Sequence, residues 1–458
     1  MIKTAGSFLT STLKEKSWGI KAARILAASL EAVDPATAVK RMLKLQGQTL
    51  LAGERQFEVP DYGSIYLLSI GKAAHSMASA ASDLLPGQIS SGLILTKHEH
   101  RADRLPGKVF TYLQGGHPIP DRNSINSGEE IITRLSGLSR DDLVIILISG
   151  GGSALFTVPP QGISLKDLQQ TNQAFQEHGL DILEINTIRK HLSRVKGGQL
   201  AEILYPAQTI TLILSDVIGD PTDIIASGPT APDNSTYQDA LMIIKKYQLD
   251  TLLPPSVLRH IRAGGKGLVP ETPKPGDQIF DNQMIRVIAG NNDAISGGLK
   301  QAQEEGFVGI RLEEELAGEA RLAGEGLAKR LLQRRSSADN PSSCLIAGGE
   351  TTVTLTDIER PGKGGRNLEL ALSTVRPLAD VDNIALITLA TDGEDGVTDA
   401  AGAVVTGETM ARAHHLGLDP EEYLRKHDSY HFFQALDDLL LPGVTGTNTN
   451  DLCFLFTF

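Results

Sequence analysis

The chain has 458 residues and a formal net charge of −12, with 41% hydrophobic and 21% charged residues. This length favours two or three domains with ordinary cores. The negative charge argues against binding to nucleic acid or to an anionic membrane surface. No apolar run reaches the ~18 residues of a membrane span, and residues 1–18 lack the apolar centre of a secretory signal. Two cysteines, Cys344 and Cys453, are too few for a disulfide framework. We therefore expect a cytoplasmic protein.

Apolar, strand-like runs alternate with helical patterns along most of the chain. The expected strands are Ile65–Ile70, Leu93–Thr96, Val109–Leu113, Leu143–Ser149, Thr209–Ser215, Met284–Ala289, Val308–Leu312, Cys344–Gly348, Ile384–Ala390 and Leu452–Phe456. The expected helices include Ile20–Val33, Ser124–Leu135, Leu165–His178, Asp293–Glu305, Glu319–Arg334 and Asn367–Leu378. This alternation predicts an α/β fold of βαβ units with a mostly parallel sheet.

A stretch rich in Gly, Pro and charge, residues 264–276, indicates either a linker or a long surface excursion. We expect it to close a first domain, residues 1–280. A second α/β domain then follows over residues 281–458.

A glycine-rich loop ends the fourth expected strand, and it consists of Ser149, Gly150, Gly151, Gly152 and Ser153. Successive glycines permit positive φ and bring the backbone close to a ligand. Their N–H groups can converge on an anion, and the two hydroxyls add donors. Open α/β sheets bind ligands at the carboxyl ends of their strands. The loop is therefore a candidate phosphate cradle, although a flexible strand-to-helix turn is an equal alternative.

Charged side chains follow two other expected strands of the first half. Lys72 comes after Gly71 and opens a helix, where free N–H groups and the helix dipole already favour an anion. Asp216 and Asp220 follow the strand that ends at Ser215, and paired carboxylates suit Mg²⁺ or the acceptance of a hydroxyl proton. A solvated lysine and a simple Asp-Pro turn are the structural alternatives.

The second half repeats this pattern of polar residues at strand ends. Glu350 follows Gly348 and Gly349, and Arg366 stands at the start of a helix, where a cation is unfavourable unless an anion offsets it. Asp392, in Thr391-Asp-Gly-Glu-Asp-Gly396, suits a metal, ribose hydroxyls or plain turns. Asn450 lies in a polar stretch before the last strand and is a further candidate for binding a metal or a substrate.

Two further motifs stay open between a ligand-binding and a structural role. His117-Pro118 can face a ligand, or the His117 ring can form only structural hydrogen bonds within the fold. The basic run Arg189–Lys196 can face phosphates or form a solvated helix face. The sequence holds no P-loop motif. In the dinucleotide fingerprint, Leu155 takes the position of the third glycine, so the nicotinamide signal is weak. No cysteine or histidine cluster has the spacing of a zinc site.

Taken together, five motifs resemble the glycerate 2-kinase family. They are Ser149-Gly-Gly-Gly-Ser-Ala-Leu155, Ser215-Asp-Val-Ile-Gly-Asp220, Gly349-Glu-Thr351, Gly364-Gly-Arg-Asn-Leu-Glu-Leu370 and Thr391-Asp-Gly-Glu-Asp-Gly396. The second half of the chain resembles the MOFRL domain.

The resemblance implies two α/β domains, the larger N-terminal one Rossmann-like, with the active site in the interdomain cleft. It implies ATP-dependent, Mg²⁺-assisted phosphorylation of D-glycerate at the 2-hydroxyl, with Lys72 and Arg366 as the principal cations of the active site. It also implies that the protein binds neither nucleic acid nor membranes, and it is compatible with a homodimer.

On this hypothesis the 149–153 loop, with Glu350, binds the nucleotide, and Lys72 bridges the transferring group. Arg366 binds the glycerate carboxylate or stabilises the charge that develops on the phosphoryl group. Asp216, with Asp220 and Asp392, positions the metal or the hydroxyl. A hydroxypyruvate reductase using NAD(P)H and a non-catalytic nucleotide or sugar-acid binding protein are the alternatives.

Overall fold

The computed structural model describes residues 3–97, 105, 107–313, 315–336, 341–355 and 361–458. The chain forms two compact units, one of Pro35–Ile288 and one of Met1–Asp34 with Ala289–Phe458. The two units differ from the expected division in two respects, because the first 34 residues belong with the C-terminal part and the boundary follows residue 288 instead of 280. The Gly- and Pro-rich stretch 264–276 lies inside the first of these units, as a surface excursion rather than as the link between domains.

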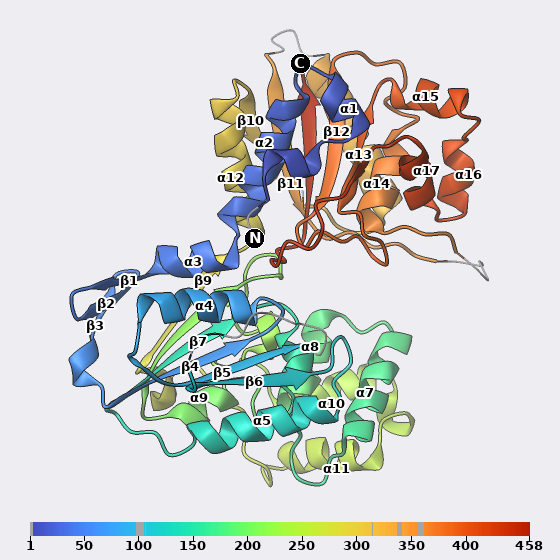
Figure 1. The fold of residues 1–458 in the computed structure, drawn as a ribbon. Helices are drawn as coiled ribbons and strands as arrows, with labels where there is room; N and C mark the ends of the chain where they lie inside the picture. Colours follow the sequence, from blue (N-terminus) through green and yellow to red (C-terminus); the bar gives the residue numbers. More distant parts are fainter. Residues whose placement is uncertain (1–2, 98–104, 106, 314, 337–340, 356–360) are drawn as a thin grey trace. The chain divides into compact units, whose positions relative to one another are not determined.

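The unit Pro35–Ile288 is built on a six-stranded sheet (Figure 1). Its order is β6-β5-β4-β7-β8-β9, with neighbours from β6 to β8 pairing in parallel. The strands are β4 Ser64–Ile70, β5 Ile89–Lys97, β6 Phe110–Gly115, β7 Asp142–Ile148, β8 Gln208–Leu214 and β9 Gln283–Ala289. The chain runs outward from β4 to β6 and then returns beside β4 as β7, so the strand order reverses between β4 and β7.

Helices cover both faces of this sheet because its strands are almost wholly apolar. One face packs on α4 (Ala74–Leu84), and the other packs on α5 (Arg122–Leu135) and α9 (Gln199–Leu204). A satellite apolar cluster joins α7 (Leu165–Glu177), α8 (Ile182–His191), α10 (Tyr237–Lys246) and α11 (Pro255–Gly264). This cluster holds α8 firmly, which matters because α8 carries part of the basic run.

One helix and three short strands at the start of this unit precede the large sheet. The helix α3 (Pro35–Met42) leads into a small antiparallel sheet of β1 Leu43–Gln46, β2 Thr49–Ala52 and β3 Arg55–Glu58. The sequence patterns did not predict these three strands. Each has four residues, which is too short for its alternation to stand out.

The other unit holds a mixed six-stranded sheet of order β10-β11-β15-β12-β13-β14. Only β10 and β11 pair in parallel, and the other neighbours are antiparallel. The strands are β10 Val308–Arg311, β11 Ser343–Gly349, β12 Ile384–Ala390, β13 Gly402–Thr406, β14 Leu439–Leu440 and β15 Asp451–Thr457. The expectation of two α/β units, with a mostly parallel sheet in the first, is confirmed.

Both faces of this mixed sheet are also covered. One face is covered by α12 (Asn291–Glu304), and α2 (Gly19–Ala32) packs on α12. On the other lie α13 (Ala320–Arg335) and α14 (Arg366–Thr374). Short helices complete the unit: α1 Ser11–Glu15, α15 Thr409–His415, α16 Pro420–Arg425 and α17 Ser429–Ala435.

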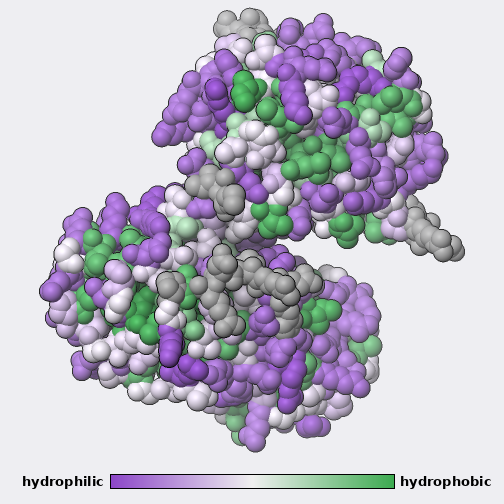
Figure 2. Space-filling view, in the orientation of Figure 1, coloured by the Kyte–Doolittle hydropathy of each residue, from purple (hydrophilic) through white to green (hydrophobic). Residues whose placement is uncertain are grey.

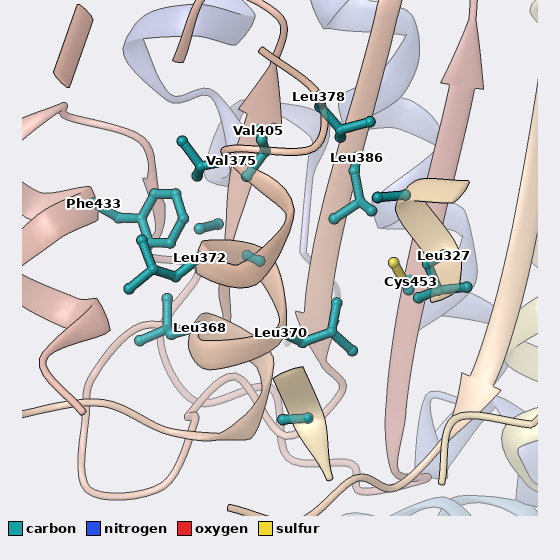
Figure 3. Close-up of a cluster of buried hydrophobic side chains, with 14 of the residues drawn as sticks. Leu327, Leu368, Leu370, Leu372, Val375, Leu378, Leu386, Val405, Phe433 and Cys453 are labelled. Atoms are coloured by element: carbon teal, nitrogen blue, oxygen red, sulfur yellow. The ribbon is translucent and has the colours of Figure 1, made fainter. Parts of the chain in front are cut away.

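The helix α14 is buried along its length although it is not apolar all round, because its buried Glu369 is paired with Arg321 and His427. Leu368 and Leu372 point toward Phe433, and Leu370 points toward Leu327 and Cys453 on the opposite side (Figure 3). Residues 367–374 are all buried. This packing fixes the start of α14, and therefore the backbone of Arg366.

The surface of each unit is ordinary for a globular protein. Hydrophilic side chains cover most of the visible face of each unit, and hydrophobic residues form small separate patches (Figure 2). Among the described residues, no helix combines the length and the apolar character needed to cross a membrane.

Candidate active site

The sheet of the unit Pro35–Ile288 brings two of the predicted loops together. The loops that follow β4 and β7 are neighbours at the point where the strand order reverses, which is where doubly wound sheets bind ligands. The backbone N–H of Lys72 donates a 2.9 Å hydrogen bond to the carbonyl of Gly150. Lys72 therefore lies beside the glycine-rich loop.

The glycines of this loop are required by their neighbours. Gly71 has a φ of +123°, and a Cβ there would collide with Ser149. Gly151 has a φ of +86°, and a Cβ there would stand 2.9 Å from the His117 ring and 3.4 Å from Cγ of Lys72. A Cβ on Gly150 would collide with the carboxylate of Asp216. Lys72, His117 and Asp216 thus surround one short stretch of backbone.

The two serines of the loop have different roles from those expected. The Ser149 hydroxyl is buried and accepts a 3.0 Å hydrogen bond from the N–H of Ala73, so it fastens the loop to the segment that opens α4. The Ser153 hydroxyl shares a 2.8 Å hydrogen bond with Ser227, which in turn donates to Asn186. The hydroxyl of Ser149 is therefore used inside the protein, and Ser153 is the serine that faces a cavity.

This cavity has a volume of about 230 Å³. The glycine-rich loop and the short helix α6 (Gly152–Leu155) form one side, and α7 and α8 form another. The charged residues of its lining are Asp216, Arg189 and Lys196. Its lining also includes His117, Pro118, Pro120, Gly151, Gly152, Ser153, Ala154, Thr157, Leu168, Thr171, Asn172, Leu192 and Ala226.

Asp216 is the predicted acid that the structure brings to this cavity. Burial raises the pKa of Asp216, while a hydrogen bond from its own backbone and the nearby Lys72 oppose that rise. A carboxylate with a raised pKa is better able to accept a proton. Asp220 lies in the following turn with a φ of +55°, and it is not among the residues that line the cavity.

His117 faces the same loop and is held as a neutral imidazole. Desolvation lowers its pKa to about 4, and the positive charges of Lys72 and Lys97 act in the same direction. The ligand-facing interpretation of His117-Pro118 therefore agrees with the position of this loop on the cavity.

The basic run Arg189–Lys196 is not a solvated helix face, because most of it points inward. Lys190 is buried and pairs with Asp223 and Asp233 at 3.3 and 3.2 Å, which makes it structural. Arg189 and Lys196 line the cavity, while Arg194 pairs with Glu129 at the surface.

Lys196 is only 4% exposed, and its ammonium donates to the carbonyls of Ser153 and Phe156, both at 2.7 Å. Burial lowers the pKa of Lys196 to about 7, with a smaller effect of Arg189. These two hydrogen bonds from Lys196 hold both ends of residues 153–156, the segment that follows the glycines.

A second group of charged residues gathers at the start of α14 in the other unit. The Arg366 guanidinium pairs with Asp451 at 2.5 Å and with Glu350 at 2.7 Å. Burial opposes the charge of Arg366, but Asp451 and Glu350 outweigh it and raise the pKa of Arg366. The structure thus places two predicted residues, Arg366 and Glu350, in one group.

Asp395 explains why a cation is tolerated at this helix start. Its carboxylate accepts hydrogen bonds from the backbone N–H groups of Asn367 and Leu368, at 3.1 and 2.8 Å, and so supplies the negative charge that the helix dipole favours. Burial raises the pKa of Asp395 to about 7, while the N–H of Leu368 opposes that rise.

The remaining candidates of this unit are less directly engaged. Asp392 accepts a 3.2 Å hydrogen bond from the N–H of Glu394, which is the local turn expected for Asp-Gly. The carbonyl of Asn450 accepts from Thr391. In the part of the chain that the structure describes, no three or more His, Cys, Asp or Glu side chains form a cluster that could hold a metal ion.

Sequence reasoning overlooked Asp395, Asp451 and Asn172. Asp395 and Asp451 both stand in motifs that it did examine, Thr391–Gly396 and the polar stretch before the last strand. Their roles depend on Arg366 and Asn367, which are far away in the sequence, so no local signal marks them.

Comparison with known proteins covers nearly the whole chain. Residues 21–262 match a family described as a domain of unknown function, DUF4147, and residues 343–451 match the MOFRL family. A D-glycerate 2-kinase of Thermotoga maritima is 39% identical over 435 residues, which are 94% of this chain and 96% of that protein. A protein of Agrobacterium vitis that carries the name hydroxypyruvate reductase is 39% identical over 85% of this chain and 86% of its own length.

The solved structures agree with these relatives. The crystal structure of glycerate kinase from Thermotoga maritima superposes with a TM-score of 0.82 at 38% identity, and the match covers 95% of this chain and 98% of that one. The identity and the coverage together show that the chain belongs to the glycerate 2-kinase family.

Proposed function

We propose that this protein transfers the terminal phosphoryl group of ATP to the 2-hydroxyl of D-glycerate. The observation that carries the proposal is the grouping of Lys72 and Asp216 around Gly150, at the strand-order reversal of a doubly wound sheet. Phosphoryl transfer needs a positioned hydroxyl and compensation of phosphate charge more than covalent chemistry. A cation and a proton-accepting carboxylate beside one glycine-rich loop suit both needs.

Each residue then has a distinct task. Lys72 offsets charge on the transferred phosphoryl group, and the N–H groups of Gly150, Gly151 and Gly152 bind phosphate oxygens. Asp216 orients the glycerate hydroxyl and accepts its proton, a task that its raised pKa supports. In the other unit, Asp451 and Glu350 hold the guanidinium of Arg366, the second cation inferred from the family resemblance, in one orientation.

The donors present fit a Mg²⁺ ion that arrives with its nucleotide. Mg²⁺ is usually held by one or two carboxylates together with substrate phosphates rather than by an all-protein cage. Asp216 is a carboxylate on the cavity, and among the described residues no three or more His, Cys, Asp or Glu side chains form a group that could hold a metal ion. When bound, the metal neutralises phosphate charge. Asp220 and Asp392 are weaker candidates because neither lines this cavity.

The reductase alternative is less well supported by the loop itself. In a dinucleotide fold the pyrophosphate lies at the start of the helix that follows the glycines, and the third glycine lets that helix pack closely. Here Leu155 occupies that position and is fully buried, and α6 spans only Gly152–Leu155.

A cytosolic location suits the two buried cysteines, both of which are free thiols.

Phosphorus NMR of the product formed from ATP and D-glycerate tests the proposal directly. The expected spectrum shows ADP and 2-phosphoglycerate, with 3-phosphoglycerate absent. A parallel assay with NADPH and hydroxypyruvate should show no loss of nicotinamide absorbance. Formation of 3-phosphoglycerate would correct the position of transfer, and oxidation of NADPH without ADP release would reject the kinase.

A further inference from the structure

Arg189 is a cavity-lining guanidinium that lacks a carboxylate partner among the described residues. Its Nε donates a 2.8 Å hydrogen bond to the side-chain oxygen of Asn172, which is a neutral amide. Its neighbours in the basic run differ, since Lys190 pairs with two aspartates and Arg194 pairs with Glu129. A guanidinium turned toward a cavity and matched only by an amide retains donors for an anion.

The charges around the cavity favour an anionic occupant. Arg189 is the cation of the lining that keeps donors for a ligand, because the Lys196 ammonium already donates to the carbonyls of Ser153 and Phe156 and burial lowers its pKa to about 7. Asp216 is the one acid of the lining. Desolvation lowers the pKa of Arg189, as expected for a cation whose charge is not balanced inside the protein. A bound anion would supply that balance.

The size of the cavity limits which anion it can take. Its volume of about 230 Å³ is below the ~300–1,000 Å³ of pockets that bury drug-sized ligands, so it suits a small acid better than a whole nucleotide. Leu168 and Leu192 give the lining an apolar part, and Ser153 and Thr171 give it hydroxyls. A short carbon chain with a carboxylate and hydroxyl groups matches this combination.

Arg366 is less available for a carboxylate. Its Nε and Nη2 are directed at Asp451, and its Nη1 at Glu350. A substrate carboxylate would have to compete with two acids there. At Arg189 it competes only with an amide.

We infer that Arg189 binds the carboxylate of the acceptor substrate, and that this cavity makes the protein specific for small 2-hydroxy acids over neutral polyols. The inference rests on the proposed function and deepens it. Asp216 lines the same cavity, so an acid anchored at Arg189 can present a hydroxyl to it. Lys196 is a positioning residue, because its two bonds hold the carbonyls of Ser153 and Phe156.

The test compares Arg189→Gln with Arg194→Gln, an arginine of the same segment that points to the surface. Loss of one charge-assisted contact should raise KM for D-glycerate about 10- to 100-fold in Arg189→Gln. The KM for ATP should stay within about twofold. Arg194→Gln should leave both constants unchanged. Glycerol, which has no carboxylate, should be an equally poor acceptor for the wild type and for Arg189→Gln.

A second variant keeps the guanidinium and protects the test against misfolding. Asn172→Asp is nearly isosteric and places a carboxylate against Nε of Arg189. This internal acid should compete with the substrate and weaken glycerate binding to a similar extent. If both variants bind glycerate as the wild type does, or if only the KM for ATP rises, the inference is overturned.

Calorimetric titration of D-glycerate without ATP separates this inference from the proposed function. Tight binding by the wild type and weak binding by Arg189→Gln support the acid pocket even if no phosphoglycerate forms. Normal phosphoglycerate formation with unchanged glycerate binding in Arg189→Gln rejects the pocket and leaves the kinase intact. A wild type that binds no glycerate at all rejects the pocket as well.

Discussion

Asp216 lies so close to Gly150 that a Cβ at position 150 would collide with the Asp216 carboxylate. Gly150 is also fixed from the other side, because its carbonyl accepts a hydrogen bond from the N–H of Lys72. One small residue therefore separates a cation-bearing segment from a carboxylate. Any side chain at this position must displace one of them.

Gly150→Ala should lower kcat about 100-fold, because the added methyl group must push the Asp216 carboxylate away from its place. A misplacement of about 1 Å is enough for a loss of this size. Steady-state kinetics with ATP and D-glycerate measures the effect. Gly326→Ala is the matched control, since a Cβ there meets nothing within 4 Å and it lies inside α13. Equal activity of the two variants would contradict the role of Asp216.

Lys72→Met should lower kcat about 10²- to 10³-fold, the usual loss when one preorganised charge partner is removed. The loop should persist, because the backbone N–H of Lys72, and not its side chain, bonds to Gly150. The thermal midpoint of unfolding should therefore stay close to that of the wild type. Lys40→Met, which removes an exposed pair with Asp83, is the control for loss of a lysine. Turnover within about threefold of wild type would remove Lys72 from the mechanism.

His117 should remain neutral throughout the pH range 6–8, because desolvation and two lysines lower its pKa to about 4. Its protonation therefore does not contribute an acid limb near pH 6.5 to the rate profile. Removing the positive charge in Lys72→Met favours the imidazolium, so the pKa of His117 should rise toward 6.5 in that variant.

NMR titration of the imidazole signals, with the His117 signal assigned from a His117→Gln sample, measures this shift. An identical titration curve in wild type and Lys72→Met would show that Lys72 exerts no field on the ring.

Arg366→Gln should destabilise the unit Met1–Asp34 with Ala289–Phe458 as well as lower activity. The Asp451 side chain is 3% exposed, and without the guanidinium it is a buried charge with no cation. The expected loss is roughly 3 kcal/mol, the lower end for a broken buried pair, because Arg366 itself is one-third exposed.

The double variant Arg366→Gln/Asp451→Asn separates the two effects. It should recover most of the unfolding free energy but not the activity, if the guanidinium acts on phosphate charge. Arg376→Gln, which breaks an exposed pair with Glu421, should change stability by about 1 kcal/mol at most. Recovery of full activity in the double variant would mean that Arg366 is only structural. Chemical denaturation followed by kinetics at 25 °C gives both quantities.

Most strands of the two six-stranded sheets and most of the long helices were predictable because each carries its own apolar run or periodicity. The stretch Leu143–Ile148 is apolar at every position, as a strand buried on both faces must be. The starts of α7 and α10 also carry a local signal, because each helix begins at a capping box, Ser164 with Asp167 and Thr236 with Asp239.

Contacts between distant residues were not predictable. The positive charge of Arg366 at a helix start looked like a misfit that a ligand would correct, yet Asp395, Asp451 and Glu350 already offset it. Likewise, the inward direction of Lys190 depends on Asp223 and Asp233, and nothing within Arg189–Lys196 encodes it. The helical periodicity of Ile20–Val33 predicted α2 but not the element on which it packs.

That packing has a consequence for how the molecule is made. Because Met1–Asp34 belongs with Ala289–Phe458, α2 leaves the ribosome long before its main neighbour, α12. At about 5–20 residues per second, α2 waits tens of seconds with its apolar side uncovered. The segment Pro35–Ile288, which is continuous, is synthesised complete during that interval. Nascent chains halted before residue 289 should therefore recruit chaperones through their first 34 residues.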